Sequence, residues 1–87
     1  MRRLAFDARF LEDLRYWVST DRKTALRLLA LLDAVARNPF AGIGSPERLR
    51  HFDSNTWSRR LTQADRVIYR VEGDTVKFLQ GRFHSGS

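Results

Sequence analysis

The stretch Arg66–His84, RVIYRVEGDTVKFLQGRFH, decides how the second half of this chain folds. Apolar and polar residues alternate on both sides of Glu72-Gly73-Asp74, three residues that favour a tight turn. The pattern predicts a β-hairpin whose second strand ends at His84. With the turn centred on Gly73, the expected cross-strand neighbours are Arg70 with Val76, Ile68 with Phe78, and Arg66 with Gln80.

Residues upstream of this hairpin predict a larger sheet. Trp57–Thr62 alternates as a strand does, and Gln63–Asp65 supplies a turn into the hairpin. A shorter strand is expected around Arg48–His51. The segment Phe40–Pro46 contains two glycines and reads as a loop.

Before residue 40 the apolar residues recur with helical spacing. The first helical face consists of Phe10, Leu11, Leu14, Trp17 and Val18. The second consists of Ala25, Leu28, Leu29, Leu32, Val35 and Ala36. Asp7 and Asp21 are suitable N-cap residues, and Asn38-Pro39 ends the second helix. Because almost nothing separates the two helices, we expect an antiparallel helical hairpin.

The order of elements predicts an α+β domain. A short N-terminal strand over Arg2–Phe6 precedes the two-helix hairpin, and a three- to four-stranded antiparallel sheet follows it. We expect the helices to cover one face of a twisted sheet. Residues 1–87 form a single domain in this interpretation, since a chain of 87 residues has no room for a second core.

Composition narrows the class of partner. The sixteen basic residues outnumber the ten acidic ones and are all arginine except Lys23 and Lys77. The planar guanidinium fork matches phosphate oxygens, which favours nucleic acid as a partner. Two alternatives account for the excess of arginine equally well: the codon usage of a GC-rich genome and an acidic protein partner. Without cysteine, a signal peptide or a long apolar run, the chain is expected to be cytoplasmic, with no membrane contact.

His84 is the first candidate for chemistry, because histidine gives and takes protons near neutral pH. In the expected register, Arg66, Arg82 and His84 project from one face of the sheet. Two cations beside an imidazole suit a reaction at phosphate, in which the cations stabilise developing charge and the imidazolium protonates a leaving oxygen. The alternatives are a frayed terminal histidine without a role, and a one-residue slip that sends this set to the other face.

Glu47 is the candidate base. It follows the Phe40–Pro46 loop and precedes Arg48 and Arg50, among which a carboxylate is expected to stay ionised. The alternative is an ordinary surface salt bridge.

Two further features are less specific. Arg59 and Arg60 either contact an RNA backbone or form a solvated pair. The spacing of the two histidines gives no sign of a metal site.

Several blocks of this sequence resemble the YoeB (Txe) branch of the RelE toxin superfamily, over nearly the whole chain and in the same order. The blocks are Tyr16-Trp17, Asn38–His51 (NPFAGIGSPERLRH), Trp57–Leu61 (WSRRL) and Arg66–Tyr69 (RVIY). The resemblance implies the RelE-like fold. It also implies a toxin of a type II toxin–antitoxin system that enters the ribosomal A site and cuts mRNA. The nucleophile is the 2′-hydroxyl of the RNA, and no metal or other cofactor is needed.

Carried over position by position, the resemblance implies that Glu47 is the general base and His84 the general acid, while Arg66 stabilises the phosphate in the transition state. Arg50 stands where the family usually has a lysine near the scissile phosphate. We also assign Arg59, Arg82 and Phe83 to the substrate-binding surface. The implied partners are the 70S ribosome with its rRNA and mRNA, a second copy of the toxin, and an acidic antitoxin that wraps it.

One departure from the family concerns the tail. The family typically ends in a tyrosine directly after the catalytic histidine, whereas here Ser85-Gly86-Ser87 follows His84. The tail is native, a remnant of an expression vector or a deliberate change. Because the aromatic ring is a plausible stacking surface for a base, we expect reduced cleavage.

Two other functions are compatible with this fold. The first is a non-catalytic toxin that poisons DNA gyrase, as ParE-like proteins do, although such a binder has no need of Glu47, Arg66 and His84 together. The second is an interaction or DNA-binding module whose arginines meet only an acidic partner or DNA.

Overall fold

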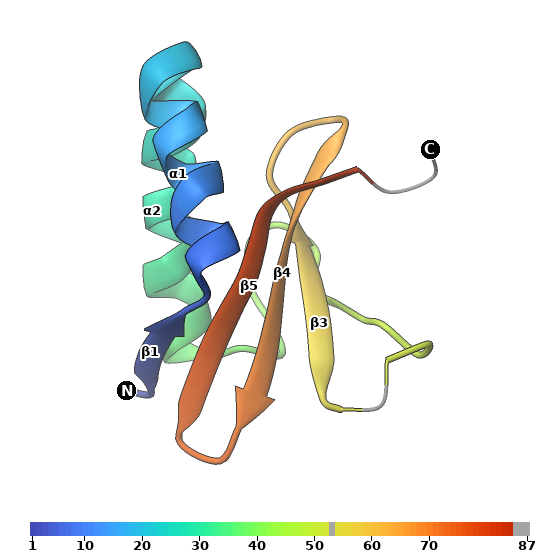
Figure 1. The fold of residues 1–87 in the computed structure, drawn as a ribbon. Coiled ribbons are helices and arrows are strands. Elements are labelled where there is room, and N and C mark those ends of the chain that lie inside the picture. The colour runs from blue at the N-terminus through green and yellow to red at the C-terminus, as the bar shows by residue number, and fades with distance from the viewer. Residues whose placement is uncertain (53, 85–87) are drawn as a thin grey trace.

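A computed structural model describes residues 1–52 and 54–84 of the chain (Figure 1). The tail Ser85-Gly86-Ser87, on which reduced cleavage is predicted, lies outside the described residues. The elements in chain order are β1 (Arg3–Phe6), α1 (Ala8–Thr20), α2 (Arg22–Arg37), β2 (Glu47–Arg48), β3 (Thr56–Arg60), β4 (Asp65–Glu72) and β5 (Thr75–His84).

Both helices begin where their caps predict. The carboxylate of Asp7 accepts a hydrogen bond from the backbone N–H of Arg9, 2.9 Å away, at the start of α1. Asp21 caps α2 by accepting from the backbone N–H of Thr24 at 3.2 Å. The hydrogen bond from the Thr24 hydroxyl, together with those from backbone N–H groups, holds the pKa of the Asp21 carboxyl below its usual value. The predicted helical hairpin is therefore confirmed.

The five strands form one mixed sheet in the order β1-β5-β4-β3-β2. Strands β2 to β5 are antiparallel neighbours, as predicted. The N-terminal strand β1 joins them by pairing in parallel with β5, which places Leu4 beside Val76 and Phe6 beside Phe78. A parallel neighbour requires a crossover connection, and α1 and α2 supply it.

The predicted register of the hairpin is wrong by one residue near its turn. Val71 pairs with Val76 and Glu72 with Thr75, so the turn contains only Gly73 and Asp74. Gly73 has a φ of 60°, which glycine adopts without strain and which permits this two-residue turn. Further along, the pairing shifts twice between Arg66 and Tyr69, and Arg66 lies opposite Phe83. Such β-bulges cannot be inferred from an alternating pattern.

The helices pack against one face of the sheet (Figure 1). The core between the two layers includes Phe10 of α1, Leu28 of α2, Tyr69 of β4 and Phe78 of β5, all 0% exposed. No helix of the described chain covers the opposite face, which we call the open face. None of the helices is long and apolar enough to cross a membrane, within the residues searched.

Candidate functional site

Glu47 and Arg66 meet on the open face. The residue after the Phe40–Pro46 loop is Glu47, which pairs with Ser58 across β2 and β3. Arg66 reaches both residues: its Nε donates a 2.9 Å hydrogen bond to Ser58 Oγ, and its Nη2 lies 3.4 Å from Glu47 Oε2. The arginine side chain is 14% exposed, whereas the glutamate side chain is 67% exposed. The cation is therefore fixed while the carboxylate stays accessible to a ligand.

A groove of about 390 Å³ adjoins this pair. Its walls are Glu47, Arg48, Leu49, Arg50, His51, Phe52 and Phe83. Arg66 and Phe83 are cross-strand partners, so their side chains lie on the same face. The structure thus brings together four of the predicted site residues, namely Glu47, Arg50, Arg66 and Phe83.

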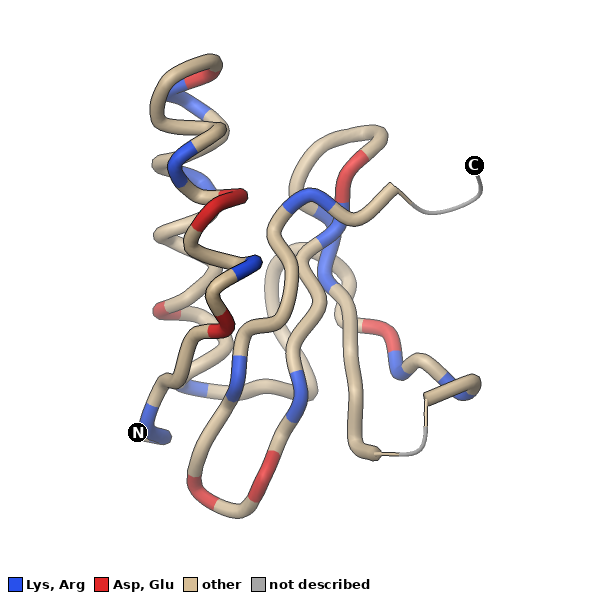
Figure 2. The backbone as a smooth tube through the Cα atoms, viewed as in Figure 1, with Lys and Arg blue, Asp and Glu red and all other residues tan. Residues whose placement is uncertain are grey.

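Basic side chains continue from the groove across the open face. Arg60 lies opposite Arg66, and Arg70 lies opposite Lys77. Figure 2 shows that Lys and Arg positions recur along β3, β4 and β5. One carboxylate on this surface is Glu72, whose Oε2 lies 3.1 Å from Arg70 Nε. A row of cations on an accessible face suits a polyanionic ligand.

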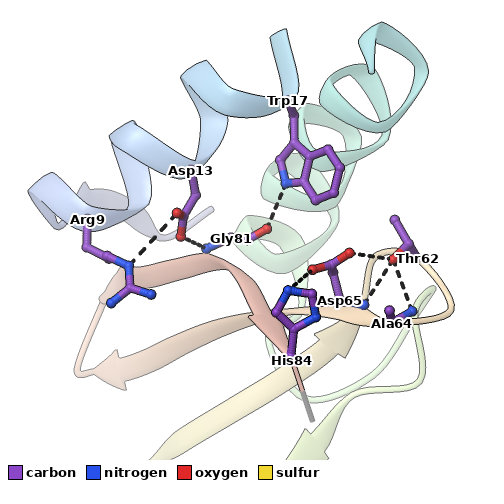
Figure 3. Close-up of polar contacts among 8 residues, drawn as sticks. All are labelled: Arg9, Asp13, Trp17, Thr62, Ala64, Asp65, Gly81 and His84. Atoms are coloured by element: carbon purple, nitrogen blue, oxygen red, sulfur yellow. Dashed lines mark hydrogen bonds and ion pairs between the residues drawn. The ribbon is translucent and has the colours of Figure 1, made fainter. Parts of the chain in front are cut away.

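The prediction that Arg66, Arg82 and His84 share a face is wrong. Because His84 pairs with Asp65 and Phe83 with Arg66, the bulged register puts His84 on the other side of the sheet from Arg66. The His84 imidazole is directed at Asp65, and its Nε2 lies 3.4 Å from Asp65 Oδ1 (Figure 3). His84 directly follows the groove residue Phe83 and its side chain is 55% exposed, so it lies at the accessible end of β5.

Arg82 belongs to the contact between the sheet and α1. Its guanidinium carbon lies 3.4 Å from the centre of the Tyr16 ring and 6.0 Å from that of Trp17. Its Nε is buried and has no hydrogen-bond acceptor among the described residues. The predicted phosphate-binding role of Arg82 in the groove is therefore not supported, because the side chain stacks on an aromatic ring of the helix layer.

The predicted substrate-binding role of Arg59 is not supported either. It is 0% exposed, so it has no surface with which to bind a substrate phosphate. Its guanidinium donates to the backbone carbonyls of Asn38, Ala41 and Ile43 and to the hydroxyl of Tyr69. Arg59 therefore holds the loop that leads into Glu47. Burial raises the pKa of the Tyr69 hydroxyl, and the neighbouring Arg59 opposes part of this effect.

Sequence reasoning missed Ser58 and Asp65. Ser58 is 0% exposed and orients Arg66, a role that depends on the pairing of β3 with β4. The sequence pattern predicts Asp65 only as part of a turn. The available signal was its spacing from Thr62, since a hydroxyl and a carboxylate three residues apart commonly close a turn through side-chain hydrogen bonds. Within the described residues, no group of three His, Cys, Asp or Glu side chains is arranged to hold a metal ion.

Comparisons with known proteins agree on one family. A family model described as the YoeB-like toxin of bacterial type II toxin-antitoxin systems matches residues 6–85. Toxin YoeB of Mycobacterium bovis is 43% identical over 84 residues, covering 97% of this chain and 99% of that protein. A YoeB dimer from Staphylococcus aureus superposes with a TM-score of 0.84 at 28% identity, covering 95% of this chain and 97% of that one. The heterotetrameric YoeB-YefM toxin-antitoxin complex from the same organism gives a TM-score of 0.79 at 30% identity, covering 97% and 98%.

Proposed function

Because this chain belongs to the YoeB-like toxins of bacterial type II toxin-antitoxin systems, within the RelE/ParE superfamily, we propose that it is a ribosome-dependent endoribonuclease that cleaves mRNA in the A site. One observation carries the proposal: an accessible Glu47 carboxylate is held by a nearly buried Arg66 beside a groove. A toxin that acts by binding alone has no need of a carboxylate fixed in this way.

The pair suits attack by a 2′-hydroxyl on the adjacent phosphate. Glu47 takes the hydroxyl proton, and the bond between the 2′-oxygen and phosphorus forms. Negative charge then accumulates on the phosphate oxygens, where the Arg66 guanidinium stabilises it. Since Ser58 already fixes Arg66, little reorganisation is required during the reaction. In this scheme the nucleophile belongs to the RNA, and no metal ion takes part.

The second half of the reaction needs a proton donor. His84 lies on the other side of the sheet from Arg66, but its ring is 55% exposed at the end of β5, next to the groove residue Phe83. From that strand end its imidazolium protonates the 5′-oxygen as the bond from phosphorus to this oxygen breaks. The products are a 2′,3′-cyclic phosphate and a free 5′-hydroxyl. Phe83 and Arg50 line the groove and are proposed to contact the base and the neighbouring phosphate. The row of cations on the open face is proposed to contact rRNA.

We propose the partners on the same basis. The similar S. aureus proteins form a dimer in one structure and a complex with YefM in another. For this chain we infer a homodimer and a complex with its own antitoxin. The net charge of +6 favours an acidic antitoxin segment.

The proposal is tested by mapping breaks in an mRNA under translation. We expect cleavage only when ribosomes are present, with products that carry 2′,3′-cyclic phosphate ends. A 2′-O-methyl group at the cut position removes the nucleophile and is expected to block the break. Glu47→Gln and His84→Gln should each lower the cleavage rate by about 10²- to 10⁴-fold. Glu12→Gln, an exposed glutamate on α1, is the matched control and should cleave at the original rate.

Other outcomes contradict the proposal. Cleavage of the 2′-O-methyl substrate excludes attack by the 2′-hydroxyl. Intact mRNA combined with breaks in DNA that depend on gyrase identifies the non-catalytic alternative. In that case Glu47→Gln should leave toxicity unchanged.

A further inference from the structure

Asp65 is a buried carboxylate with no role in the proposed cleavage reaction. It opens β4 at the same end of the sheet as His84 and is 6% exposed. A buried carboxylate costs free energy unless hydrogen bonds or an opposite charge compensate it. Its surroundings therefore indicate what it does.

The two carboxylate oxygens of Asp65 have different partners (Figure 3). Oδ2 accepts a 2.9 Å hydrogen bond from the hydroxyl of Thr62, and that hydroxyl oxygen also accepts from the backbone N–H of Asp65 at 2.9 Å. This reciprocal pair fixes the carboxylate group within the turn. Oδ1 has no hydrogen-bond partner among the described residues and lies 3.4 Å from His84 Nε2. The fixed carboxylate thus presents to the imidazole the oxygen that the turn leaves without a hydrogen bond.

The strand end that carries His84 is held from the helix side as well. The backbone N–H of Gly81 donates to Asp13 Oδ2 at 2.8 Å, and Trp17 Nε1 donates to the carbonyl oxygen of Gly81 at 2.9 Å. Both partners come from α1 (Figure 3). The Asp65 contact therefore acts on a ring whose backbone is already fixed three residues earlier.

We propose that Asp65 is the positioning residue of His84. Its Oδ1 turns the imidazole ring and favours the tautomer with the proton on Nε2. A carboxylate in this place holds the ring in one orientation, as a general acid requires. The inference rests on the proposed function for its catalytic consequence, but the contact itself can be tested without cleavage.

The first test is ¹⁵N NMR of the histidine side chains in the free protein at neutral pH. The chain has two histidines, so His51→Gln assigns the signals of His84. We expect neutral His84 to carry its proton on Nε2 and Asp65→Asn to shift the population towards the Nδ1 tautomer, because an amide N–H can donate to Nε2. Asp33→Asn makes the same change of charge on the exposed side of α2 and should shift nothing.

Two results of this measurement overturn the inference. One is an unchanged set of His84 shifts in a folded Asp65→Asn variant. The other is a predominance of the Nδ1 tautomer in the unmodified protein, which decides the question even if the variant does not fold.

The second test measures cleavage on the ribosome. Asp65→Asn should lower kcat by about 10-fold or more with KM unchanged, a smaller loss than that of His84→Gln. Asp65→Glu keeps the charge and should recover part of the rate. If the unmodified protein cleaves and Asp65→Asn is equally fast, the inference fails while the proposed function stands. If the unmodified protein does not cleave, the proposed function fails and the NMR result alone decides whether Asp65 orients His84.

Discussion

Arg59 holds the loop between α2 and β2 with the two terminal nitrogens of its guanidinium group. These nitrogens donate to three backbone carbonyls of this loop, those of Asn38, Ala41 and Ile43. Tyr69 completes the arrangement by accepting from Arg59 Nε and donating to the carbonyl of Pro39 at 2.6 Å. At the scale of single residues, the groove therefore depends on two side chains that never touch a ligand.

The substitution Arg59→Met tests this structural role. It removes four hydrogen bonds of a fully buried guanidinium, three of them to loop carbonyls, so we expect the free energy of unfolding to fall by about 3 kcal/mol or more. Urea denaturation measures the change. Arg60→Met, at the exposed neighbouring position, should cost only about 0.5 kcal/mol. An Arg59→Met protein that is as stable as the original but binds RNA poorly would contradict the structural role.

The raised pKa of Tyr69 predicts a loss of stability in alkali. The folded state favours the neutral hydroxyl, so this contribution is complete below the unfolded pKa of 10.0 and disappears as the pH rises through the folded pKa. Urea denaturation between about pH 8 and 11 should show the decline.

Tyr69→Phe is the control for this decline. It should be less stable at pH 8 by about 1–3 kcal/mol, because the Pro39 carbonyl loses its donor. Its stability should then fall less steeply above pH 10 than that of the original protein. Parallel declines in the two proteins would show that other groups cause the alkaline loss.

Among the larger elements, the contact between α1 and β5 positions the end of the strand that carries Phe83 and His84. Gly81 lies so close to both helices that an added Cβ would be 3.3 Å from Asp13 Cβ of α1 and 3.3 Å from Leu28 Cδ2 of α2. A side chain at this position must push β5 away from the helices.

Gly81→Val is therefore expected to destabilise the protein by about 1–3 kcal/mol. In the fraction that remains folded, the hydrogen bonds to Asp13 and Trp17 should be weakened and the cleavage rate should fall. Thermal unfolding and the ribosome assay measure the two effects. Gly81→Ala, whose single methyl group adds less volume, should show the same changes to a smaller degree. Equal stability and rate in all three proteins would contradict the close approach of β5 to the helices.

Local patterns predicted the elements well, since caps such as Asp7 and Asp21 and the helical spacing act over a few residues. The parts that depend on pairing were less predictable. A two-residue turn at Gly73 and bulges between Arg66 and Tyr69 reassign the partners of β5, which is why His84 faces Asp65 and not Arg66. The resemblance located Glu47 and Arg66, and the structure places them in contact. It could not show that Arg59 is buried, because arginine is usually exposed.

At the scale of the whole molecule, cations are gathered on the face that the helices leave open. A ligand held mainly through phosphates releases counterions on binding, so its affinity falls steeply with salt. We expect the affinity for ribosomes to decrease linearly on a plot of log K against log salt concentration.

Replacing Arg60 and Arg70 by Gln should reduce the magnitude of that slope by about 2, which is about 1 for each phosphate that the protein no longer neutralises. Arg22→Gln, at the start of α2, should leave the slope unchanged. Filter binding or sedimentation at several salt concentrations provides the measurement. If the ribosome affinity of the original protein does not change with salt concentration, binding is not dominated by phosphate contacts.

The position of β5 between β1 and β4 also has a consequence for synthesis. A nascent chain exposes β1 and both helices before Thr75–His84 has left the exit tunnel, and until then β1 has no strand to pair with. The same ten residues bring Phe83 to the groove and His84 to Asp65. Co-translational folding therefore cannot complete the sheet, or form the contact between His84 and Asp65, before β5 has emerged.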